Sequence, residues 1–292
     1  MKLKRIFAVL TSCLLTLSLA ACGNNQTVSS NKIGNEEEVV VATSVAVTEI
    51  LDALEVDVAG VPNTSYELPE STKDAVRVGN PMSPNLEIIK SLNPDVVVSV
   101  DTLGSDYEKL FTDNKIPSEF VSLSSLESLK ETIDSLGRKF NKMDKAQELV
   151  NDISNKEAEL SKNKLEKEKI ELLVLFAAPG STMIATEKSY IGSLVEIAGG
   201  KNIIEDNSSA FVTYSNEEIT KLNPEKILVM THAMPEQTKA ALEKEFEQSS
   251  AWQSLTAVKE GKVIYLDNTY FGMSANLKVI DGLGILQDII YQ

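Results

Sequence analysis

His232 and Met82 are the two residues whose types and placement in this sequence could serve a metal ion. His232 is the only histidine among the 292 residues, and it comes shortly after the apolar run 227–230, which predicts a buried strand. Met82 follows a second predicted strand, 75–78, through the turn sequence Gly79-Asn80-Pro81. A neutral imidazole and a thioether would suit the two axial positions of haem iron, whereas Mn and Ca prefer oxygen ligands.

Both residues also have a plainer interpretation. A single histidine is more often structural than a ligand, and a methionine at a turn is usually a packing residue. Their positions favour the ligand hypothesis, because open α/β sheets place ligands outside the carboxyl ends of their strands. We expect Ser83 and Pro84 to cap and begin the next helix, which would hold the Met82 sulfur on a fixed turn.

The composition excludes most other chemistry. The two cysteines, Cys13 and Cys22, both lie in the N-terminal segment, so the folded body has no thiol for a disulfide, a zinc site or a nucleophile. There is no P-loop, no Rossmann glycine fingerprint and no Gly-x-Ser-x-Gly elbow, and the chain is therefore not expected to be an enzyme. The net charge of -15 argues against nucleic acid and against lying flat on anionic lipid.

The N-terminus predicts export with a lipid anchor. Three basic residues precede an apolar run that is too short to span a bilayer, and the run ends in the lipobox Leu19-Ala20-Ala21-Cys22. We expect a signal peptide at 1–21, an acylated Cys22 as the first mature residue, and a flexible tether over 22–38. The body would then sit on the outer face of the cytoplasmic membrane, held by lipid alone. A chance cysteine after an ordinary signal peptide is the alternative.

An internal repeat indicates two similar halves. Residues 87–95 and 217–225 share Glu, Ile, Leu, Asn and Pro at one spacing, and each copy predicts a helix, a tight turn and a buried parallel strand. Similar turns within one α/β domain could also produce this repeat. Between the copies, a segment dense in Lys and Glu without Gly or Pro predicts a long helix. At ~1.5 Å per residue it would extend roughly 40 Å.

These patterns predict an α/β fold with two Rossmann-like lobes, a connecting helix and a ligand cleft between the lobes. The expected boundaries are 39–139 for the first lobe, 140–168 for the helix and 169–292 for the second lobe. The expected strands are 39–42, 56–61, 75–78, 96–100, 170–176, 183–185, 227–230 and 263–266. Helices are expected near 191–198, 236–247 and 277–290, with Gly199-Gly200 ending the first of these.

Four segments give the chain a resemblance to a known family. They are Gly79-Asn80-Pro81-Met82-Ser83-Pro84-Asn85-Leu86-Glu87, Lys188-Ser189-Tyr190-Ile191-Gly192, Ala198-Gly199-Gly200 and His232-Ala233-Met234-Pro235-Glu236. With them the chain resembles the haem-receptor lipoproteins within the helical-backbone (class III) substrate-binding proteins of ABC importers. The Leu-Asn-Pro pattern is common to siderophore and cobalamin receptors, whereas the Pro-Met-Ser-Pro and His-Ala-Met-Pro segments are more specific.

The resemblance implies roles for particular residues. Met82 and His232 match the axial ligands of haem (iron protoporphyrin IX), and Glu87 and Glu217 match the acids through which relatives dock on an ABC permease. The exposed first-turn position of both glutamates is also what an ordinary helix start favours. Six residues lie in segments that could line an apolar porphyrin slot, although each alone is more often core: Tyr66, Phe211, Tyr214, Tyr270, Phe271 and Met273.

The sequence therefore favours a lipid-anchored, monomeric receptor that passes haem to an ABC permease and accepts it from upstream haem-donor surface proteins. The alternative is a siderophore or cobalamin receptor, in which the axial pair has no role. Siderophore pockets often use arginine, and beyond the signal segment the chain contains only Arg77 and Arg138, which argues against that alternative.

Overall fold

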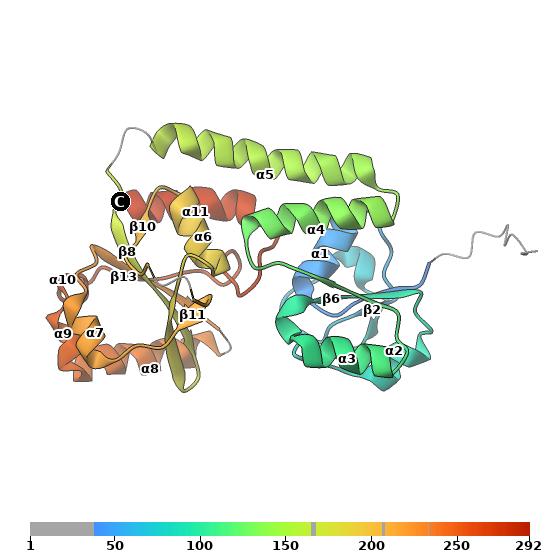
Figure 1. Cartoon of the computed structure of the whole chain (residues 1–292), viewed down its shortest axis with the longest axis horizontal. Coiled ribbons are helices and arrows are strands. Elements are labelled where there is room, and N and C mark those ends of the chain that lie inside the picture. The colour runs from blue at the N-terminus through green and yellow to red at the C-terminus, as the bar shows by residue number, and fades with distance from the viewer. Residues whose placement is uncertain (1–37, 165–167, 206–207, 233) are drawn as a thin grey trace, which may run out of the picture. The chain divides into compact units, whose positions relative to one another are not determined.

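The computed structural model describes residues 38–164, 168–205, 208–232 and 234–292. The expected signal peptide, Cys22 and nearly all of the expected tether lie outside these ranges. Among the described residues, no helix is long and apolar enough to cross a membrane. Two large β-sheets with helices on their faces and one two-stranded hairpin make up the described part of the chain (Figure 1).

The first sheet has five parallel strands in the order β3-β2-β1-β6-β7. Its central strands are valine-rich and buried on both faces, as parallel strands covered by helices must be. The strands are β1 Val40–Ala42, β2 Gly60–Val61, β3 Val76–Arg77, β6 Val96–Val100 and β7 Ser118–Val121. The helices are α1 Val45–Ala53, α2 Leu86–Ser91, α3 Ser105–Asp113 and α4 Leu126–Lys139, with short 3-10 turns η1 Glu70–Thr72 and η2 Asp101–Leu103.

Alternate side chains of this sheet enter two different cores. Val40, Ala42 and Val98 belong to the cluster that also contains residues of α1 and α4. Val41 and Val97 point to the other face and pack with residues of α2 and α3. This two-residue alternation is the geometry of a strand, and it leaves both faces of the sheet covered.

The second sheet has six strands and is mixed. Strands β8, β12 and β13 are parallel, and β10 pairs in parallel with β8. Strand β9 pairs antiparallel with β8, and β11 pairs antiparallel with β9. The strands are β8 Glu171–Ala178, β9 Ser181–Ala185, β10 Lys201–Asn202, β11 Phe211–Val212, β12 Lys226–Thr231 and β13 Val263–Tyr265. The helices are α6 Tyr190–Ile197, α7 Asn216–Lys221, α8 Pro235–Gln248, α9 Ser250–Ser254, α10 Thr256–Lys259 and α11 Val279–Tyr291.

A long helix, α5 Met143–Lys164, connects the two sheets along the chain and runs beside α4 and α11 (Figure 1). Its buried residues Ala146, Ile153 and Leu160 are seven apart and so form one apolar stripe. The helix begins later than the expected residue 140, because Phe140 caps the end of α4 and Asn141 has a φ of 57° that breaks the helical path. At ~1.5 Å per residue it extends roughly 33 Å, somewhat less than expected.

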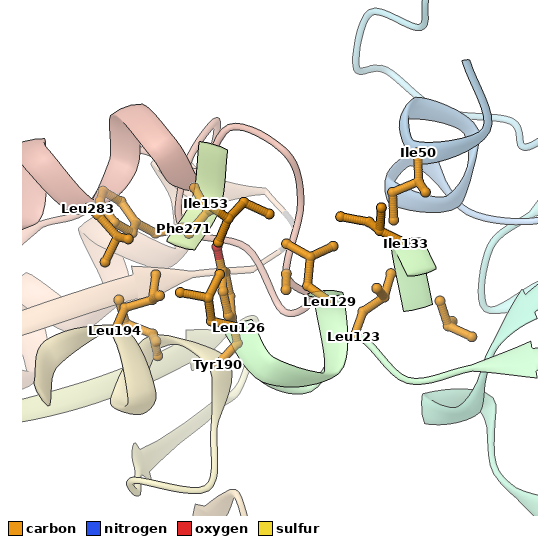
Figure 2. Close-up of a cluster of buried hydrophobic side chains, with 14 of the residues drawn as sticks. Ile50, Leu123, Leu126, Leu129, Ile133, Ile153, Tyr190, Leu194, Phe271 and Leu283 are labelled. Atoms are coloured by element: carbon orange, nitrogen blue, oxygen red, sulfur yellow. The ribbon is translucent and has the colours of Figure 1, made fainter. Parts of the chain in front are cut away.

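One apolar cluster contains residues of both sheets. Leu126 and Leu129 at the start of α4 lie in the same cluster as Tyr190 of α6 and Leu283 of α11 (Figure 2). A backbone hydrogen bond of 2.8 Å from Ala275 N to Leu123 O joins the same two parts of the chain. The prediction of an α/β fold with two sheets joined by a long helix is confirmed.

Several of the expected strand boundaries differ from those in the structure. Of the expected strand 56–61, only Gly60–Val61 pairs in the sheet. The preceding residues complete the end of α1 instead, because Val56 N donates to Leu51 O and Glu55 has a φ of 56°. The expected strand 183–185 is longer and forms a hairpin with β8.

Candidate functional site

Met82 lies at the tip of a small hairpin, and the expectation that Ser83 and Pro84 cap the next helix was wrong. Strands β4 Gly79–Asn80 and β5 Ser83–Pro84 pair antiparallel, which leaves Pro81 and Met82 as the connecting turn. The cap is Asn85, whose side chain accepts hydrogen bonds from Glu87 N and Ile88 N at 3.0 and 3.1 Å. Ser83 and Pro84 instead form strand β5, and helix α2 begins after Asn85.

Gly79 makes this hairpin possible. Its φ of +104° is unfavourable for residues with a side chain, and a Cβ there would lie 2.7 Å from Asn85 N. Asn85 N instead donates to Val78 O at 2.7 Å, which closes the base of the hairpin. The hairpin follows β3, so Met82 lies beyond the carboxyl end of a parallel strand, and the residue is 63% exposed.

His232 directly follows β12, as expected, at the carboxyl end of a parallel strand in the second sheet. Its backbone N–H donates to Ala177 O at 2.7 Å, which fixes the residue to the neighbouring strand β8. The residue is exposed, yet partial desolvation lowers the pKa of its imidazole below the usual value of 6.5. The ring therefore favours the neutral form that binds metals.

Phe176 lies close to both His232 and Phe211, one of the predicted pocket residues. Its ring centroid lies 5.9 Å from that of His232 and 4.9 Å from that of Phe211. Phe211 is half-buried, so part of its ring remains available beside this group. Sequence reasoning did not select Phe176, because it lies within an apolar strand and resembles any core residue. The signal that could have found it is the pairing of β8 with β12, which places Phe176 opposite Met230.

The other predicted pocket residues occupy different environments. Tyr66 and Met273 are exposed, whereas Phe271 is fully buried in the shared apolar cluster and Tyr270 is half-buried beside it. Tyr214 packs at 5.5 Å against Trp252 in the core under α8 and α9, and burial raises the pKa of its hydroxyl. Phe271 is therefore a core side chain, and Tyr214 is a partly buried side chain at the edge of a core.

Glu87 and Glu217 occupy matching places, as the repeat predicts. Each lies in the first turn of a six-residue helix, α2 or α7, and each is exposed. The helix N-terminus favours a carboxylate there. Glu217 also pairs with Lys221 at 2.7 Å, but this exposed i,i+4 pair contributes little to stability.

A comparison with models of protein families assigns the chain to a family. Residues 40–270 match the model of the periplasmic binding proteins. The chain belongs to this family. It is a family of binding proteins, in agreement with the expectation that the chain is not an enzyme.

Individual relatives are similar over nearly the whole chain. The high-affinity heme uptake system protein IsdE of Staphylococcus aureus strain Newman is 35% identical over 291 residues, which is 99% of each chain. The crystal structure of S. aureus IsdE complexed with heme has a TM-score of 0.84 and 33% identity, covering 88% of this chain and 100% of that one. An ABC transporter substrate-binding protein from Listeria monocytogenes EGD-e gives 0.83 and 35%, covering 88% and 99%.

Proposed function

We propose that this chain is a haem receptor of an ABC importer that holds haem iron between Met82 and His232. The observation that carries the proposal is the placement of an exposed thioether and the only imidazole beyond the carboxyl ends of parallel strands in two sheets. The similarity to a heme uptake protein over 99% of both chains supports haem as the cargo.

The donor set suits a cargo that brings most of its own ligands. Within the described ranges, no three His, Cys, Asp or Glu side chains are grouped so as to hold a metal ion. Iron in a porphyrin already has four equatorial nitrogens and needs only one ligand on each face, which a single His and a single Met can supply. Phe211 and the exposed Tyr66 and Met273 would give the porphyrin apolar contact.

The direct test is the visible spectrum of the haem-loaded chain and of its Met82→Ala and His232→Ala variants. We expect each variant to lose one axial ligand and to shift the absorbance bands that report iron ligation. Met143→Ala is the matched control, because Met143 is also exposed, at 37%, but begins α5. Unchanged ligation in both variants would overturn the assignment.

The location we propose is the outer face of the cytoplasmic membrane, with Cys22 carrying the lipid. The support is the lipobox at residues 19–22 together with membership of a family of periplasmic binding proteins. A lipid keeps an acidic carrier close to its transporter without affinity for the anionic lipid surface. Cys22→Ala should release the protein from membranes and leave haem binding intact; a variant that stays membrane-bound would contradict this.

The partner we propose is an ABC permease that receives haem from the receptor, with Glu87 and Glu217 as the docking acids. Both glutamates are exposed in first helical turns, one associated with each sheet. Upstream haem-donor proteins would load a monomeric receptor. Each sheet could then present one acid to the permease.

A siderophore receptor is the second candidate, since the triscatecholate siderophore binding protein FeuA from Bacillus subtilis is 25% identical with a TM-score of 0.70. The two arginines of the body argue against it. Arg77 donates to Pro62 O at 3.1 Å, and Arg138 pairs with Asp134 on α4. A direct titration in which a ferric catecholate binds more tightly than haem would rank the siderophore receptor above the haem receptor.

A further inference from the structure

Both backbone polar groups of Met82 are held by side chains. Met82 N–H donates to Asn80 Oδ1 at 2.9 Å within the hairpin. The hydroxyl of Tyr107 donates to Met82 O, also at 2.9 Å, from a helix 25 residues further along the chain. The first contact is local, whereas the second ties the hairpin tip to another element of the fold.

Tyr107 is itself well anchored. It lies in the first turn of α3, where its N–H donates to Gly104 O at 3.0 Å. Its ring packs against the apolar cluster that contains Ile89 of α2 and Phe111 of α3. The hydroxyl therefore reaches Met82 from a side chain whose ring is fixed by the core of the first sheet.

The side chain of Met82 has a different environment from its backbone. The backbone is hydrogen-bonded at both polar groups, yet Met82 as a whole is 63% exposed. Ordinary packing would bury the sulfur of a methionine. A held backbone with a free side chain is the arrangement that presents a ligand in a prepared position, which lowers the entropy lost on binding.

We propose that Tyr107 is a positioning residue that holds the Met82 turn in the orientation needed for its sulfur to reach haem iron. This inference rests on the proposed function. A tyrosine hydroxyl suits the role because it reaches the carbonyl without adding a charge beside the iron. The alternative, a hydrogen bond that only stabilises the hairpin, predicts a loss of stability without a change in iron ligation.

The test compares Tyr107→Phe with Tyr291→Phe in the full haem-loaded chain. Both changes remove a tyrosine hydroxyl bond of 2.9 Å to a backbone carbonyl, but Tyr291 donates to Gly199 O in another part of the fold. We expect Tyr107→Phe to raise the haem dissociation rate about 2- to 10-fold, the range of one hydrogen bond, and to weaken the sulfur-to-iron absorbance band. Tyr291→Phe should change neither.

A second comparison makes the coupling specific. In a Met82→Ala background, Tyr107→Phe should cause no further change in the dissociation rate, because the ligand it positions is gone. If Met82→Ala raises the rate and Tyr107→Phe leaves both rate and spectrum unchanged, the positioning role is overturned and the haem assignment stands. If Met82→Ala has no effect on either, the axial assignment itself fails.

Discussion

The imidazole ring of His232 lies 5.9 Å from the ring of Phe176, centroid to centroid, with 31° between the two planes. One side of the imidazole therefore meets an apolar surface while the residue stays exposed to solvent. Partial desolvation disfavours the charged form and lowers the pKa of His232. The neutral imidazole, which is the form able to bind a metal, therefore persists to a lower pH than it does in a free histidine.

The first prediction is a pH dependence of haem binding. Because the pKa of folded His232 is lowered, haem affinity should begin to fall at a lower pH than it would for an unshifted histidine, whose usual pKa is about 6.5. As the pH falls through that value, the folded chain binds fewer protons than the unfolded chain. His232 therefore lowers the free energy of unfolding at acidic pH. Haem titrations and urea unfolding at a series of pH values measure both effects.

His232→Gln is the control for that prediction, because it cannot protonate. Its unfolding free energy should fall less on the acid side than that of the parent chain. An affinity that already falls well above pH about 6.5 would contradict the lowered pKa.

The second prediction concerns docking. Glu87→Ala combined with Glu217→Ala should leave haem binding intact and abolish haem uptake by cells, because both exposed acids are proposed to contact the permease. The matched control is Glu108→Ala with Asp144→Ala, which removes exposed first-turn acids of α3 and α5. Normal uptake in the first pair, or equal loss in the control pair, would refute the docking assignment.

The third prediction concerns Met234, two residues after His232. Its φ of 42° and ψ of 58° are left-handed, no side chain caps the helix that it precedes, and the residue is 53% exposed. Such a conformation costs a non-glycine residue ~1–2 kcal/mol. Met234→Gly should therefore raise the free energy of unfolding by about 1 kcal/mol after the greater chain entropy of glycine is counted.

Met234→Ala is the comparison for that change. Alanine keeps a Cβ and therefore keeps the backbone strain, so the thermal unfolding temperature of this variant should not rise. If both variants leave haem affinity unchanged, the thioether of Met234 has no part in binding. A Met234→Gly chain less stable than the parent would show that the side chain contributes packing that outweighs the strain.

The fourth prediction concerns Gly192 in the first turn of α6. A Cβ at this position would overlap Thr186 O and would lie 2.9 Å from the Oγ of Ser189, which caps the helix. Gly192→Ala should lower the free energy of unfolding by about 2 kcal/mol, the usual size of overpacking. Gly284→Ala in α11 is the control: its nearest neighbour is the flexible end of Lys156 at 3.6 Å, so it should be neutral or stabilising.

Much of the fold was predictable because its signals are local. The valine-rich run 96–100 is a strand with the expected bounds, and the repeated Leu-Asn-Pro segments do end helices before buried strands. Gly199 ends α6 with a φ of 97°, as the glycine pair predicted. Each of these depends on backbone preferences or on apolar periodicity, which a short stretch of sequence contains in full.

Composition and residue order alone indicate the candidate donor atoms: the one histidine, the absence of thiols from the body and the methionine that follows Gly79-Asn80-Pro81. The contacts that hold these side chains arise from the packing of the fold. The contact of Phe176 with His232 and the bond from Tyr107 to Met82 O join residues 56 and 25 positions apart. Such contacts arise when strands pair and helices pack, so no local pattern could predict them.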